Sequence, residues 1–281
     1  MENVISVDVE QWFHRPILHG HLRNIDLASQ HIFEALRKIL QILKKYKKRT
    51  TFFVLGEVAE YLPEVVEEIV KEGNEVAFHG YSHLTLPELG EKKFEKEIES
   101  GISNIRHITK ERLRGFRAPM FSLNKKTVWA LKILERYKFK YDSSVFPTKT
   151  PKYGMWSAPT KLYTPSFQDP AKEDANQTKI LEFPVLTRKI LFLKIPAAGG
   201  FYLRLFGANF ILESIRNMNK RGYPAMCYVH PWEIYGFPKI NLPIHKRLFA
   251  YHGVPCIKHF EKLIRNVDVA PAIEILENMG V

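Results

Sequence analysis

Two histidines and a distant pair of acids have the residue types and spacing to bind a metal ion. His79 and His83 lie four positions apart, and Asp8 and Glu10 lie two apart near the N-terminus. Imidazole nitrogens bind zinc, iron, cobalt or nickel, and a helical turn after residue 79 would put both rings on one face. Alternation along a strand points both acids the same way, where they repel unless a cation or proton separates them. The pattern indicates a metal held by Glu10, His79 and His83, with Asp8 left as a general base.

Three more polar residues follow short apolar runs. Arg117 is suited to hold Asp8 ionised, although a surface arginine at a turn explains it equally well. His230 has the chemistry of a general acid, and a hydrogen-bonded core histidine is the competing interpretation. Asp142 either orients His230 or caps a turn, and the residues leave both roles open.

The periodicity along the chain alternates between strand and helix. Apolar β-branched runs predict strands at 4–8, 51–55, 75–78, about 114–117, near 141, 180–185 and 225–229. Helical spacing predicts helices at about 28–48, 63–71, 91–108, 124–137, 207–221 and 258–265. Alternating elements favour a parallel sheet.

The positions of the polar residues distinguish a barrel from an open sheet. Five candidates end five separate predicted strands: Asp8, His79, Arg117, Asp142 and His230. Such ends converge on one face only when the sheet curves round, whereas an open sheet gathers its site at one crevice. We therefore expect an α/β protein, a distorted (β/α) barrel of about seven parallel strands, in a single domain over residues 1–281. Residues 143–179 show little periodicity and predict a long decorating loop beside the site.

Composition limits the possible partners. The net charge is +12, and the densest basic run, 44–49, ends a predicted helix, where a solvated terminus is favoured over a polyanion site. No nucleic-acid motif accompanies the charge, so no nucleic-acid partner is expected, while peripheral membrane contact remains possible. Two cysteines, a strand already at Val4 and no long apolar stretch predict a soluble cytoplasmic protein. The oligomeric state is not indicated.

Six ordered segments together resemble one family. They are Ser6–Phe13, His79–His83, Gly115–Pro119, Tyr141–Ser144, Ala198–Leu205 and His230–Glu233. In this order they are similar to motifs of the polysaccharide deacetylase superfamily, also called the NodB-homology or carbohydrate esterase family 4 fold. The nearest resemblance is to the PEP-CTERM, exopolysaccharide-associated branch, with residues 196–281 as a family-specific C-terminal part.

The resemblance implies hydrolysis of an acetyl group on an N-acetylated sugar or polysaccharide. By this likeness Asp8 is the base, His230 protonates the leaving amine, and Arg117 supports Asp8. A divalent metal, zinc first and cobalt, nickel or iron as alternatives, binds Glu10, His79 and His83. The backbone at Pro119 and Met120 helps to hold the oxyanion. Aromatic side chains near the motifs are candidates for packing on sugar rings: Trp12, Tyr81, Trp156, Tyr202 and Trp232.

One departure from the family pattern keeps two alternatives open. The wider family has adjacent aspartates in its first motif, whereas Val9 follows Asp8 here, so that Glu10 must reach the metal. Some relatives act on cyclic amides without a metal, so a metal-free hydrolase of a cyclic amide or ureide is one alternative. A non-catalytic carbohydrate-binding module on the same fold is the other, although all the candidate residues are present.

Overall fold

A curved sheet of seven parallel strands lies at the centre of the molecule. The computed structural model describes residues 1–14, 26–151, 153–236 and 256–281. The strand order is β6-β5-β4-β3-β2-β1-β9, and every neighbouring pair is parallel. The strands are β1 (Val4–Val9), β2 (Thr51–Val54), β3 (Glu75–Phe78), β4 (Gly115–Phe116), β5 (Tyr141–Asp142), β6 (Leu181–Glu182) and β9 (Met226–Val229).

The two edges of this sheet approach each other. Just beyond β6, Val185 forms an isolated parallel bridge with Met226 of β9, and the Leu186 N–H donates to the Met226 carbonyl at 2.8 Å. The sheet therefore curves round into a distorted, incomplete barrel. This confirms the predicted fold class and the predicted number of strands.

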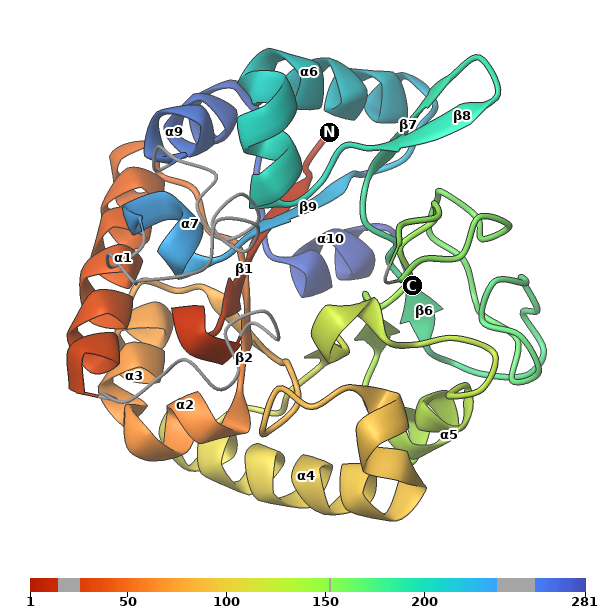
Figure 1. Cartoon of the computed structure of the whole chain (residues 1–281), viewed down its shortest axis with the longest axis horizontal. Coiled ribbons are helices and arrows are strands. Elements are labelled where there is room, and N and C mark those ends of the chain that lie inside the picture. The colour runs from red at the N-terminus through yellow and green to blue at the C-terminus, as the bar shows by residue number, and fades with distance from the viewer. Residues whose placement is uncertain (15–25, 152, 237–255) are drawn as a thin grey trace.

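Helices cover the outside of the strands (Figure 1). They are α1 (Asp26–Lys45), α2 (Gly56–Tyr61), α3 (Pro63–Lys71), α4 (Leu86–Thr109), α5 (Trp129–Arg136), α6 (Gly200–Lys220), α7 (Pro231–Tyr235), α9 (Ile257–Asn266) and α10 (Ala272–Asn278). The helix α10 begins at the amino ends of the strands, where its first two N–H groups donate to Thr51 of β2 and Glu75 of β3. The opposite, carboxyl ends of the strands are left to carry polar side chains.

The predicted elements differ from the observed ones in identifiable places. Helix α6 begins at Gly200 rather than near 207, because Gly207 (φ 75°) kinks a longer helix and interrupts its periodicity. The antiparallel hairpin of β7 (Thr187–Ile190) and β8 (Leu193–Pro196) was not predicted. Apart from residue 152, the segment 143–179 holds turns and isolated bridges. Within the C-terminal part that the family resemblance marks out, 237–255 lie outside the described residues.

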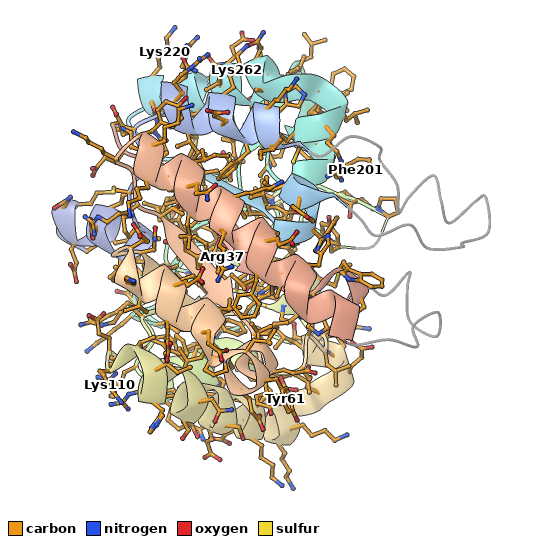
Figure 2. All side chains as sticks on the ribbon, turned by 90° about the vertical axis from the view of Figure 1, so that its left-hand side faces the viewer. Arg37, Tyr61, Lys110, Phe201, Lys220 and Lys262 are labelled. Atoms are coloured by element: carbon orange, nitrogen blue, oxygen red, sulfur yellow. The ribbon has the colours of Figure 1, made fainter. Side chains whose placement is uncertain are left out.

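Most of the cations in the densest basic run are paired with acids from other elements. Four cations at the end of α1 form ion pairs with acids from α3, α9 and the C-terminal segment: Lys44–Glu72, Lys45–Glu261, Lys48–Asp268 and Arg49–Glu274. Other basic side chains, such as Lys110, Lys220 and Lys262, are spread over the surface (Figure 2). In the described ranges, no helix is both long enough and apolar enough to span a bilayer.

Candidate active site

Glu10, His79 and His83 converge at the carboxyl ends of the strands. Their ligand atoms lie within 4.8 Å of one another, and the Glu10 carboxylate is in direct contact with His83 Nε2. Glu10 follows β1 and His79 follows β3, so the two strands on either side of β2 supply the cluster. One carboxylate and two imidazoles form a three-ligand set that fits a catalytic zinc-type ion.

A loop, and not a helical turn, brings the two histidines together. Residues 79–85 are irregular, and the conditional expectation of a helical i, i+4 pair was wrong. Gly80 (φ 81°) and His83 (φ 60°) both lie in the left-handed region, which turns the chain back sharply. A Cβ at Gly80 would also lie 3.3 Å from Pro119 Cγ, so glycine suits both the turn and the contact.

His79 is oriented as a metal ligand should be. Its Nδ1 lies 2.8 Å from the Arg117 carbonyl, which accepts a hydrogen bond from the Nδ1–H tautomer and leaves the lone pair of Nε2 for the site. Burial lowers the pKa of His79 to about 4, although the charges of Asp8 and Glu10 oppose the shift. The ring is therefore neutral at physiological pH, the form that binds metals.

Asp8 lies beside the cluster, paired with a buried guanidinium. Arg117 is fully buried and its Nη1 contacts Asp8 Oδ1 at 2.5 Å. The guanidinium also donates to the Oγ of Ser6 and to both oxygens of Ser143, and it lies over the Phe53 ring at 4.0 Å. These contacts fix Arg117, so Asp8 is held as an oriented carboxylate.

His230 lies on the other side of Glu10. Its Nε2 is 3.4 Å from Glu10 Oε1, and its Nδ1 is 2.8 Å from Glu233 Oε2. Burial by itself would lower the pKa of His230, but the charges of Glu10 and Glu233 raise it to about 9. Trp232 stacks on the ring at 4.7 Å. The charges of these two carboxylates therefore favour the protonated ring, the form a proton donor needs.

Glu233 and Arg204 are site residues that the sequence analysis missed. The Glu233 carboxylate also accepts from the His230 N–H at 3.1 Å and from Arg204 Nη2 at 3.0 Å. A Cβ at Gly200 would lie 2.1 Å from Glu233 Oε2, which explains a small residue at the start of α6. The signal in the sequence was an acid three positions after His230, the spacing of a helix capping box.

Asp142 does not orient His230 in the structure. Its Oδ1 accepts from Ser144 Oγ at 2.5 Å, and its neighbour across β5 and β6 is Glu182. Both acids are completely buried. Of the two roles considered for Asp142, the local turn contact is the one observed, because Glu233 already occupies the partner position of His230.

The predicted aromatic residues have different surroundings. Trp232 Nε1 donates to Glu10 Oε1 at 3.3 Å, so this buried ring supports a metal ligand. Trp12 is also buried, directly after β1. The Tyr81 ring packs over Gly56 and its hydroxyl bonds to Glu60, away from the cluster.

The two remaining aromatic candidates and the expected oxyanion segment lie on other elements. Tyr202, on α6, is half-buried and stacks on Phe206. Trp156 is 45% exposed. Pro119 and Met120 form a short turn, η3 (Pro119–Phe121), in which Met120 has φ 56°. Nothing in these contacts tests their predicted roles with a substrate.

One further histidine adjoins the site. The buried ring of His14 stacks on His83 at 5.8 Å, and its Nδ1 accepts from the Gln11 N–H at 3.1 Å. The sequence analysis did not select it, because its neighbours carry no strand or helix pattern.

Comparison with known families accounts for most of the chain. Residues 32–140 match the polysaccharide deacetylase model, and residues 143–277 match a domain of unknown function, DUF3473. The chain therefore carries a segment similar to the polysaccharide deacetylase family, followed by a DUF3473 region. The catalytic roles of the site residues, and the PEP-CTERM branch, are not part of that finding.

Curated deacetylases share short segments with this chain. Peptidoglycan-N-acetylmuramic acid deacetylase PdaC of Bacillus subtilis is 41% identical over 31% of this chain and 19% of its own length. A peptidoglycan-N-acetylglucosamine deacetylase of Bacillus cereus is 41% identical over 22% of each chain. The chain therefore spans about a fifth of the length of these curated relatives.

Solved structures share the fold. A structure from Mycobacterium smegmatis assigned as a polysaccharide deacetylase has a TM-score of 0.63 at 19% identity, covering 99% of this chain and 90% of that one. The Bacillus subtilis PdaC structure has a TM-score of 0.50 at 17% identity, covering 99% and 91%. A CE4 family pseudoenzyme from Bacillus anthracis also matches, with a TM-score of 0.50 at 14% sequence identity. The match covers 98% of this chain and 66% of that one. Fold likeness alone therefore does not establish catalysis.

Proposed function

We propose that this protein is a metal-dependent carbohydrate deacetylase that hydrolyses an N-acetyl group on a sugar or polysaccharide. One observation carries the proposal: Glu10, His79 and His83 form a three-ligand cluster, and Asp8 and His230 both lie beside it. A divalent ion, with zinc preferred, would supply Lewis-acid activation of water and carbonyl.

The surrounding residues would divide the proton transfers between them. Asp8, held by Arg117, would take a proton from the attacking water. His230, charged through Glu10 and Glu233, would give a proton from Nε2 to the departing nitrogen. A base and an acid that both adjoin the cluster match the needs of amide hydrolysis, in which one proton leaves the nucleophile and another reaches the leaving group.

The substrate class rests on the family and on the motifs. The curated relatives are named for peptidoglycan and chitin deacetylation, so an acetylated glycan is the proposed substrate. The segments Ser6–Phe13 and Ala198–Leu205 extend the proposal to an exopolysaccharide-associated, PEP-CTERM-type enzyme. A cytoplasmic location belongs to the same proposal.

Acetate release from N-acetylglucosamine oligomers tests the function. Asp8→Asn and His230→Ala should each lower kcat by about 10²–10⁴. Asp268→Asn and His107→Ala, both at exposed positions away from the cluster, are matched controls and should keep wild-type rates. Near-normal turnover in both site variants would refute the proposed roles.

Metal analysis distinguishes the proposal from a metal-free cyclic-amide hydrolase. We expect about one divalent ion per chain, loss of acetate release on chelation, and recovery when metal is restored. Turnover of cyclic amides that survives chelation would favour the alternative. Specific glycan binding without acetate release, in a metal-loaded protein, would favour a non-catalytic module.

A further inference from the structure

The β7–β8 hairpin carries the most exposed large apolar residues in the part of the chain that the structure describes. Leu191 is 83% exposed, Phe192 76% and Leu193 50%. The hairpin projects from the body of the molecule beyond α6 (Figure 1). Large apolar side chains gathered at a projecting tip mark a contact surface more often than isolated exposed ones do.

Two lysines face each other directly below this tip. Lys189 and Lys194 are cross-strand partners, one pair below Ile190 and Leu193. Like charges at directly opposed positions destabilise a hairpin. Burial and the charge of Lys189 lower the pKa of Lys194. Lys194 is held by contacts at the base of the hairpin, whereas Lys189 has no acidic partner among the described residues.

The tip residues are also poor choices for a tight turn. Leu191 has φ 54°, a conformation in which glycine or asparagine is favoured over a branched apolar residue. The base of the hairpin, in contrast, is firmly held. Arg188 forms two hydrogen bonds to Glu213 of α6, and Lys194 Nζ donates to the carbonyls of Trp156 and Ala158. The hairpin is therefore held firmly at its base, while the apolar side chains at its tip are exposed to water.

We propose that the β7–β8 tip is a membrane-contact site, in which Leu191 and Phe192 enter the acyl boundary of an anionic lipid surface and Lys189 lies at the headgroups. Apolar side chains combined with nearby cations are the combination that anchors peripheral proteins to anionic bilayers. The overall charge of +12 favours approach to the same surface. An apolar tip for a protein partner would not require the opposed lysines.

Vesicle co-sedimentation of the full chain tests this site. Vesicles of phosphatidylcholine with about 30% phosphatidylglycerol should bind the protein, while pure phosphatidylcholine should bind it weakly. The double variant Leu191→Ser/Phe192→Ser should bind anionic vesicles at least about tenfold more weakly. Lys189→Gln should weaken binding by about fivefold. Tyr61→Ser, at a 68% exposed aromatic on α2, is the matched control and should bind as wild type.

Three results would overturn the proposal. They are equal binding to neutral and anionic vesicles, unchanged binding by the double variant, or a dimer in light scattering that the double variant dissolves. The last result would assign the tip to a second copy of the chain. Circular dichroism and melting temperature verify that each variant is folded. Since the vesicles carry no sugar, the outcome is independent of the proposed deacetylase activity.

Discussion

His230 is held between two carboxylates that have different tasks. Glu10 faces Nε2 and belongs to the metal-ligand cluster, whereas Glu233 faces Nδ1 and is itself held by Arg204. Despite burial, which favours the neutral acid, the His230 and Arg204 cations lower the pKa of Glu233 to about 2. Glu233 is therefore ionised near neutral pH, and it both orients the ring and favours its charged form.

Substitution of Glu233 should separate these two contributions. Glu233→Gln keeps an acceptor near Nδ1 but removes the charge, and Glu233→Ala removes both. We expect kcat to fall by about 10-fold in the first and about 100-fold in the second, with KM little changed. Glu213→Gln, which also loses a carboxylate–arginine pair but at the surface, is the control. Equal loss in both Glu233 variants would mean that the charge accounts for the whole effect, and wild-type activity in Glu233→Gln would mean that the charge has no part in it.

At the scale of elements, the pairing of β5 with β6 buries two acids side by side. Asp142 and Glu182 are register partners with no solvent exposure. Burial raises the pKa of Asp142 to about 6 and, together with the charge of Asp142, raises that of Glu182 well above its usual range. The folded state therefore binds protons here that the unfolded chain releases.

This pair predicts a pH dependence of stability. Because the folded pKa values are raised, the pair's contribution is present at low pH and is lost as pH rises through about 6. Glu182→Gln keeps a neutral partner for Asp142 at all pH values. The difference in melting temperature between this variant and wild type should increase from about pH 5 to about pH 8.5. Each kcal/mol gained in unfolding free energy should raise the melting temperature by about 2–4 °C. A difference in melting temperature that decreases as pH rises would contradict the raised pKa values of the two acids.

The strand-end positions of the site residues could be predicted from the sequence, but not all of their partners. Asp8, His79, Arg117 and His230 were placed correctly at strand ends, because each follows a short apolar run whose period is local. The partnership of Glu233 with His230 could have been anticipated from its capping-box spacing. The role of Asp142 could not, since it depends on which strand lies beside β5.

The hairpin and the histidine loop escaped prediction for a different reason. The run 187–196 alternates too weakly for a strand pattern, and its turn residues are not those typical of hairpins. The geometry from His79 to His83 depends on Gly80 and His83 adopting positive φ, which spacing alone does not reveal. In both cases, tertiary contacts override local preference.

At the scale of the molecule, one bound ion would tie together segments that are about 70 residues apart. Glu10 and the two histidines reach the cluster from β1 and from the end of β3. A ligand that binds only the folded state stabilises it in proportion to RT ln(1 + [L]/Kd). The site should therefore reveal itself in unfolding measurements without any substrate.

Metal addition should raise the melting temperature. With zinc at about 100 times Kd, the expected stabilisation is about 2.7 kcal/mol over the chelated protein. Glu10→Gln should lose most of that gain, while Glu57→Gln, near His14 but outside the ligand set, should keep it. Stabilisation of equal size in the Glu10 variant would place the ion elsewhere.

The position of β1 has a consequence for synthesis on the ribosome. This first strand pairs on one side with β2, which follows soon after, and on the other with β9, which is more than two hundred residues away. Under the proposed roles, the segments that carry Glu10, His79 and His83 are therefore translated long before the segment that carries His230. Under the proposed function, hydrolytic competence would arrive only after β9 has been translated and has docked beside β1.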